Sequence, residues 1–120
     1  MPRSVLVVDD DAEFRDLATR ILTSWGHAVI GEAGSVAEAL AQAARLRPDV
    51  VLVDIGLPDG DGFSLTEQLV AMPWAVRVVL ISSSEADRTT VQSAQRAGAV
   101  SFLPKDELSG AALRQLIEGG

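Results

Sequence analysis

The stretch Val50-Val-Leu-Val-Asp54 places four apolar residues directly before an aspartate. Unbroken apolar runs of this length are typical of strands that are buried on both faces, as in a parallel sheet. Comparable runs cover Val5–Val8, Val78–Ile81 and Val100–Leu103, and a weaker one covers His27–Glu32. The sequence therefore predicts five short strands.

Segments with helical periodicity separate these strands. After the first strand, Phe14, Ala18 and Leu22 share one helical face, and Gly26 is the expected stop. A second helix is predicted from the capping box that begins at Ser35 up to Arg47, since Pro48 prevents its continuation. Three further helices are expected over Phe63–Met72, Asp87–Ala97 and the stretch that contains Leu113, Leu116 and Ile117.

Five strand-then-helix units predict an α/β fold. We expect a flavodoxin-like, doubly wound sheet of five parallel strands, (βα)5, with helices on both faces. Because crossovers between parallel strands are right-handed, the carboxyl ends of all strands meet at one edge, where such sheets bind ligands. A single domain is expected to span residues 1–120, because this length is near the commonest domain size.

The composition excludes several classes of function. Seventeen acidic against ten basic side chains give a net charge of −7, and Lys and Arg form no cluster, so direct nucleic-acid binding is not expected. The chain has no cysteine, which excludes disulfides and thiolate metal sites. No apolar run approaches the roughly 20 residues that span a bilayer, and no targeting signal is recognisable, which favours the cytoplasm.

Polar residues follow the predicted strands at the points where the strands end. Asp9, Asp10 and Asp11 follow the first strand, Asp54 ends the third, and Lys105 follows the fifth. Ser82, Ser83 and Ser84 follow the fourth strand. All these side chains are expected to project from the same edge of the sheet.

Carboxylates gathered at one edge repel each other unless a cation lies among them. A hard divalent ion with oxygen ligands removes this repulsion, and Mg²⁺ suits a supply of a few carboxylates and a phosphate. Aspartates after strands also serve as helix caps. The joint occurrence of all these groups favours a magnesium site over capping alone.

The sequence resembles response regulator receiver domains of two-component systems over essentially its whole length. Four motifs carry the resemblance, and they occur in the family's order and spacing. They are Val5-Leu-Val-Val-Asp-Asp-Asp11, Val53-Asp-Ile-Gly-Leu-Pro-Asp-Gly-Asp-Gly62, Leu80-Ile-Ser-Ser-Ser84 and Gly98-Ala-Val-Ser-Phe-Leu-Pro-Lys105.

The resemblance implies a role for each matching residue. Asp54 would accept a phosphoryl group from a histidine kinase in a Mg²⁺-dependent reaction, and Lys105 would neutralise one phosphoryl oxygen. Asp10 would bind Mg²⁺ directly and Asp9 mainly through water, while Gly56 would offer its backbone carbonyl. The switch residues that the resemblance implies are Ser83, with Ser82 as the close second choice, and Phe102.

The resemblance also implies how the domain would signal. It would catalyse only its own phosphorylation and dephosphorylation, and phosphorylation would alter the surface of the fourth helix, fifth strand and fifth helix, where a homodimer could form. Lys105 is followed by Asp106 and not by the family's usual proline. This feature is similar to the subgroup commonly joined to helix-turn-helix output domains, so the chain is expected to stand alone or to precede a DNA-binding domain that regulates transcription.

An alternative from another class is a phosphatase of the haloacid dehalogenase type. In such enzymes one aspartate attacks the phosphate and the aspartate two positions later acts as an acid. Asp9 and Asp11 match this spacing, but that family usually carries a threonine or valine soon after the second aspartate, where this chain has Glu13 and Phe14. The two hypotheses differ in the residue that carries the phosphoryl group: Asp54 for the receiver and Asp9 for the phosphatase.

Overall fold

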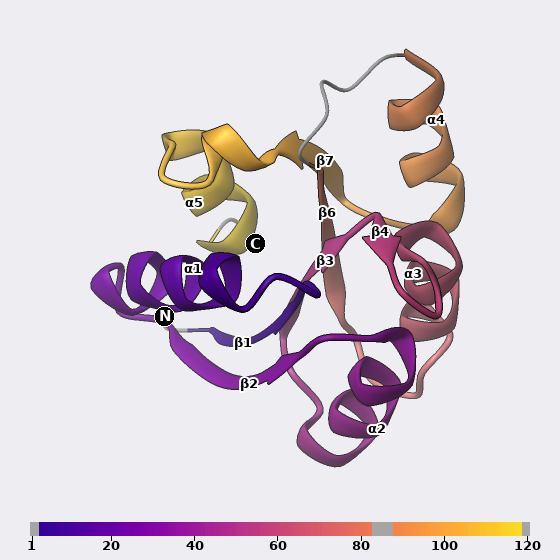
Figure 1. Ribbon diagram of the computed structural model, residues 1–120, viewed down its shortest axis with the longest axis horizontal. Coiled ribbons are helices and arrows are strands. Elements are labelled where there is room, and N and C mark those ends of the chain that lie inside the picture. Colours follow the sequence, from indigo (N-terminus) through magenta and orange to yellow (C-terminus); the bar gives the residue numbers. More distant parts are fainter. Residues whose placement is uncertain (1–2, 83–87, 119–120) are drawn as a thin grey trace.

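The computed structural model describes residues 3–82 and 88–118 of the chain. Figure 1 shows a central sheet with helices on both sides. The five-stranded sheet has the order β2-β1-β3-β6-β7, and all its pairs are parallel. Its strands are β1 (Ser4–Val8), β2 (Ala28–Ala33), β3 (Val50–Asp54), β6 (Arg77–Ser82) and β7 (Ser101–Pro104). The helices are α1 (Ala12–Ser24), α2 (Val36–Leu46), α3 (Gly62–Val70), α4 (Arg88–Ala97) and α5 (Ala111–Glu118).

The strand order reverses between β1 and β3. The chain leaves β1 toward β2 on one side and returns to β3 on the other side, and residues Leu6 and Val51 are partners across this junction. Every residue of β3 is buried, as the apolar run predicted. Ligands of doubly wound sheets bind beyond the strand ends at such a reversal. The fold therefore directs attention to the residues that follow β1 and β3.

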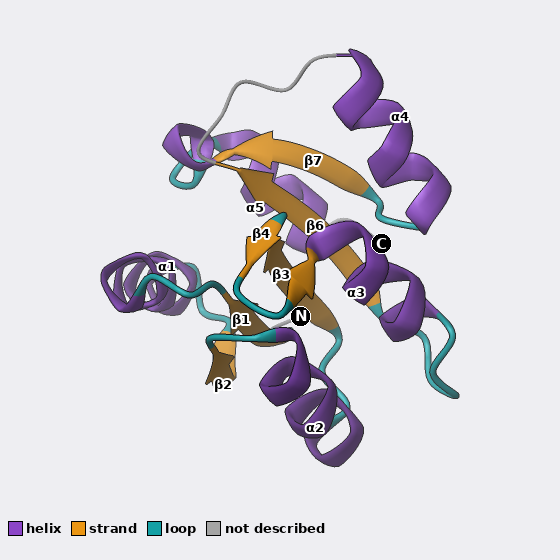
Figure 2. Ribbon diagram, turned by 45° about the vertical axis from the view of Figure 1, so that its right-hand side comes forward, coloured by secondary structure: helices purple, strands orange, loops and turns teal. Residues whose placement is uncertain are grey.

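Alternate residues of the central strands enter two separate cores. Leu6 and Val8 of β1 belong to the core under α2, α3 and α4, whereas Val5 and Val7 belong to the core under α1 and α5. Figure 2 shows these two groups of helices on opposite sides of the sheet. Each buried aliphatic side chain contributes roughly 1.5–3 kcal/mol of transfer free energy. The two cores hold the central strands from both faces and so fix the positions of the residues at the strand ends.

The predicted fold class and the five strands are confirmed, with shifts at some ends. The last strand begins at Ser101, because Val100 is 48% exposed and precedes the first paired residue. Two short elements were not predicted: the antiparallel hairpin of β4 (Gly56–Leu57) and β5 (Gly60–Asp61), and a 3₁₀ helix over Lys105–Glu107. In the described part of the chain, no helix has the length and apolarity that a membrane crossing requires.

Candidate functional site

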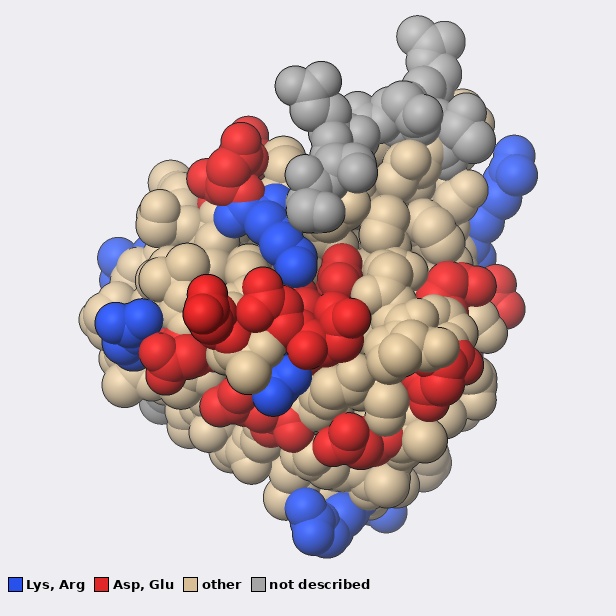
Figure 3. Space-filling model, in the orientation of Figure 1, with Lys and Arg blue, Asp and Glu red and all other residues tan. Residues whose placement is uncertain are grey.

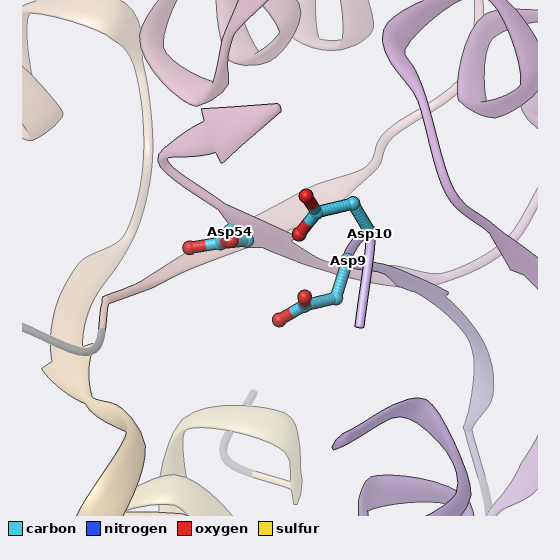
Figure 4. A group of neighbouring side chains, drawn as sticks. All are labelled: Asp9, Asp10 and Asp54. Atoms are coloured by element: carbon cyan, nitrogen blue, oxygen red, sulfur yellow. The ribbon is translucent and has the colours of Figure 1, made fainter. Parts of the chain in front are cut away.

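Three aspartates meet where the strand order reverses. Asp9 and Asp10 directly follow β1, and Asp54 is the last residue of β3. Val8 and Val53 are partners in the sheet, so the residues that follow them, Asp9 and Asp54, lie next to each other. Each of the three carboxylates offers an oxygen within 4.8 Å of the others. Figure 4 shows that the three side chains converge on one space.

The three carboxylates differ in burial and in their hydrogen bonds. Asp9 is fully buried, Asp54 is 8% exposed, and Asp10 is exposed. Asp9 Oδ1 accepts the backbone N–H of Asp11 at 2.9 Å. Asp9 Oδ2 is buried and has no well-aligned hydrogen-bond donor among the described residues. Such an oxygen is costly to bury, so it needs a cation nearby.

Lys105 supplies a cation from the other side of the site. Its Nζ lies 2.6 Å from Asp9 Oδ2 and 3.8 Å from Asp54 Oδ2. The same Nζ lies 4.4 Å from the centroid of the Phe14 ring, where an ammonium is attracted to the ring face. Lys105 follows β7, and the 3₁₀ helix that it begins brings Leu108 into the core under α1 and α5. The Lys105 side chain is thus held by Asp9 and Phe14, and its backbone is held by the 3₁₀ helix.

Burial and charge together set the ionisation of the site. Burial raises the pKa of Asp54, and the neighbouring Asp9 carboxylate raises it further. Lys105 and a hydrogen bond from the Gly56 backbone oppose this increase. Burial lowers the pKa of Lys105, but Asp9 and Asp54 outweigh this effect and raise it. The ammonium therefore stays charged, and its single positive charge faces three carboxylates.

The donor set fits a hard divalent cation. Carboxylate oxygens are ligands that Mg²⁺ prefers, and one lysine cannot balance three neighbouring carboxylates. The buried Asp9 Oδ2 already faces one cation, the Lys105 ammonium at 2.6 Å, so this part of the site favours positive charge. Figure 3 shows acidic side chains gathered over the centre of this face, with basic side chains bordering them. Asp9, Asp10 and Asp54 could hold the ion.

The structure brings together most of the residues that the sequence singled out. Gly56 lies in β4, two residues after Asp54, and an added Cβ there would meet nothing within 4 Å. Ser83 lies outside the described residues, whereas Ser82 ends β6 and is 4% exposed. Phe102 of β7 is 8% exposed and packs in the core under α2, α3 and α4. It is therefore turned inward.

Sequence reasoning missed two residues that shape the site. Arg15 of α1 donates from Nη1 to the backbone carbonyl of Asp9 at 2.6 Å, and its Nε lies 3.2 Å from Glu32 Oε1. Phe14 was predicted only as an apolar residue of the first helix, yet its ring lies beneath the Lys105 ammonium. Helical periodicity identifies the buried face but gives no sign of these contacts.

The fold and the site define a class: doubly wound domains with an acidic, lysine-paired site at the carboxyl edge of the sheet. The family model described as the response regulator receiver domain matches residues 5–118 of the chain. The chain belongs to this family, whose receiver domains act in the signalling of two-component systems.

Relatives with known names support the assignment. Over 104 residues the chain is 38% identical to protein-glutamate methylesterase/protein-glutamine glutaminase 3 of Hahella chejuensis, covering 86% of this chain and 30% of that protein. It is 34% identical over 105 residues to the transcriptional regulatory protein PdtaR of Mycobacterium tuberculosis, covering 88% of this chain and 50% of that protein. The chain thus spans half or less of the length of these relatives.

Solved structures agree with the family. The signal receiver domain of the putative response regulator NarL from Mycobacterium tuberculosis matches with a TM-score of 0.84 and 33% identity, covering 96% of each chain. A two-component response regulator of the LuxR family from Aurantimonas matches with a TM-score of 0.85 and 25% identity, covering 97% of this chain and 86% of the other. The flavodoxin-like fold is confirmed.

The family assignment decides between the two hypotheses drawn from the sequence. Nothing in the comparisons points to a phosphatase of the haloacid dehalogenase type. The geometry agrees, because Asp11, which would be the acid of that enzyme, caps α1 by accepting the N–H of Glu13 at 3.0 Å. Asp9, which would be its nucleophile, is fully buried and paired with Lys105.

Proposed function

We propose that this receiver domain, spanning residues 1–120, accepts a phosphoryl group on Asp54 from the phosphohistidine of a cognate histidine kinase. The observation that carries the proposal is the position of Asp54. Asp9 and Asp54 are both buried, but Asp54 is the more exposed of the two. The Asp54 carboxylate lies at the reversal of strand order, with the Lys105 ammonium 3.8 Å away. The bond from a carboxylate oxygen to phosphorus would form as the bond from phosphorus to the kinase histidine breaks.

Transfer to a carboxylate requires that the negative oxygens of the phosphoryl group be neutralised, so positioning and charge supply most of the catalysis. Asp9, Asp10, Asp54 and the carbonyl of Gly56 would hold Mg²⁺. When bound there, Mg²⁺ would neutralise phosphoryl oxygens. Lys105 would bind another oxygen, exchanging part of its contact with Asp9. The domain would thereby promote only its own phosphorylation and dephosphorylation.

The switch would use a hydroxyl and an aromatic side chain. We propose Ser83 as the hydroxyl that binds a phosphoryl oxygen, and Phe102 as the aromatic residue whose inward packing is stabilised in the phosphorylated state. Phe102 has no hydroxyl, so packing alone would hold it. A two-state change of this kind would alter the surface of α4, β7 and α5 and favour a homodimer there.

The output is proposed from the relatives. They include a transcriptional regulator and a methylesterase, both longer than this chain. We favour transcription regulation in the cytoplasm through a separate DNA-binding domain, because Asp106 after Lys105 is similar to the subgroup joined to such domains. The receiver itself would not contact nucleic acid, since its net charge is −7.

Incubation with acetyl phosphate and Mg²⁺, followed by intact-protein mass spectrometry, tests the proposal. The wild-type chain should gain the mass of one phosphoryl group, and Asp54→Asn should gain none. Size exclusion with beryllofluoride should show whether the activated state dimerises. Equal phosphorylation of Asp54→Asn and the wild type would contradict the assignment of Asp54.

A further inference from the structure

One side chain joins the loop after Asp54 to helix α2. Asp59 lies in the turn between β4 and β5, and its Oδ1 accepts the backbone N–H of Val36 at 2.7 Å. Its Oδ2 accepts the N–H of Ala37 at 3.1 Å. The carboxylate therefore binds the first two amides of a helix that lies more than 20 residues earlier in the chain.

These amides have no partner inside the helix, because the first turn of any helix leaves its N–H groups unpaired. The helix has its own cap, Ser35, but the Ser35 hydroxyl accepts from Glu38 N at 3.2 Å and leaves the first two amides to Asp59. The two hydrogen bonds lower the pKa of Asp59. The carboxylate thus remains ionised at the positive end of the α2 dipole.

The same contact constrains the hairpin that contains Gly56. In the hairpin, Gly56 pairs with Asp61 and Leu57 pairs with Gly60. Gly60 lies against α2 so closely that an added Cβ would be 3.1 Å from Val36 Cγ2. At the other end of the hairpin, Asp61 Oδ1 caps α3 by accepting Ser64 N at 2.7 Å. The hairpin is therefore attached to one helix at its turn and to another at its end.

We propose that Asp59 is a positioning residue for the metal site, because it holds the turn of the β4–β5 hairpin on α2 and thereby fixes the Gly56 backbone beside Asp54. This inference rests on the proposed function, in which the Gly56 carbonyl is a ligand. Mg²⁺ demands near-ideal octahedral geometry, so a ligand that moves relative to the carboxylates binds it less well. Residues that orient metal ligands are typically worth about 10- to 100-fold in affinity.

The chain offers a matched control. Asp59→Ala removes the two hydrogen bonds between the hairpin and α2, whereas Ser35→Ala removes a cap from the same helix end without touching the hairpin. Calorimetric titration should show Mg²⁺ binding about tenfold weaker in Asp59→Ala, at the lower end of that range. Ser35→Ala should bind Mg²⁺ as the wild type does. Asp59→Asn, which keeps one acceptor oxygen, should lie between them and serves if the alanine variant fails to fold.

Amide hydrogen exchange without metal gives an independent readout. The Gly56 amide should exchange faster in Asp59→Ala than in the wild type, and Ser35→Ala should leave it unchanged. Unaltered Mg²⁺ affinity and unaltered Gly56 exchange in Asp59→Ala would overturn the inference, as would an equal loss of affinity in Ser35→Ala. A wild-type chain that does not bind Mg²⁺ would contradict the proposed function instead, and the exchange of Gly56 would still decide whether Asp59 holds the hairpin.

Discussion

Replacing Lys105 with methionine should change metal binding and phosphorylation in opposite directions. The ammonium lies 2.6 Å from Asp9 Oδ2 and 3.8 Å from Asp54 Oδ2, so it competes with Mg²⁺ for the same oxygens. Even at the dielectric constant of bulk water, Coulomb's law gives these contacts roughly 1.6 and 1.1 kcal/mol. The Lys105 side chain is only 21% exposed, so water screens the attraction incompletely and these values are lower limits.

The loss of this competition should tighten Mg²⁺ binding in Lys105→Met by about tenfold, since a factor of ten corresponds to about 1.4 kcal/mol, less than the attraction removed. Phosphorylation by acetyl phosphate at saturating Mg²⁺ should slow by roughly 10²-fold, because the lysine would no longer neutralise a phosphoryl oxygen. Calorimetry measures the first effect, and the rate of mass gain measures the second.

Lys105→Arg is the control, because it keeps the positive charge with a different shape. It should bind Mg²⁺ more weakly than Lys105→Met does. Circular dichroism should first show that each variant is folded. Weaker Mg²⁺ binding in Lys105→Met than in the wild type, or an unchanged rate of phosphorylation, would refute the reasoning from these two distances.

Three further changes probe other parts of the molecule. Replacing Gly56 with a bulkier polar residue such as asparagine should alter the rate of autodephosphorylation without abolishing phosphorylation. A Cβ at Gly56 would meet nothing within 4 Å, so a side chain there has room to shield or orient the attacking water. Unchanged decay of the phosphorylated form across several substitutions would count against this. Leu69→Ala should lower the free energy of unfolding by about 2–5 kcal/mol in urea titrations, because Leu69 is fully buried in the core under α2, α3 and α4. A loss below about 1 kcal/mol would contradict the close packing inferred there. Glu118→Gln should flatten the pH dependence of stability in acid, because hydrogen bonds from Arg114 and then His27 lower the pKa of Glu118 in the folded state. The stabilisation by the Glu118 carboxylate is fully present above its unfolded pKa of about 4.3 and is lost as pH falls through the folded pKa. Identical curves of unfolding midpoint against pH for variant and wild type would exclude this role.

Much of the fold could be predicted because its strands are encoded locally. Three of the five strands contain unbroken apolar runs of four residues. The rule for right-handed crossovers places the strand ends at one edge without knowledge of any contact. Asp9, Asp10, Asp54 and Lys105 follow these strand ends in the sequence and are therefore predicted to lie together. Their convergence follows from strand order, so sequence and geometry agree.

The contacts that refine the site could not be predicted in the same way. Asp59 stands in a Gly- and Asp-rich turn where many residues would serve, and only the structure shows that its carboxylate reaches Val36 and Ala37. The 3₁₀ helix that begins at Lys105 places Nζ over Phe14, a contact between residues that are far apart in the chain. Such pairs depend on side-chain direction after folding, which periodicity does not encode.

The most direct measurement locates the phosphoryl group itself. After incubation with acetyl phosphate and Mg²⁺, borohydride reduces an aspartyl phosphate to homoserine, which peptide mass spectrometry identifies by position. The proposed function predicts homoserine at position 54 and nowhere else. Homoserine at position 9 or 10, or no modified aspartate in a chain that has gained phosphoryl mass, would contradict it.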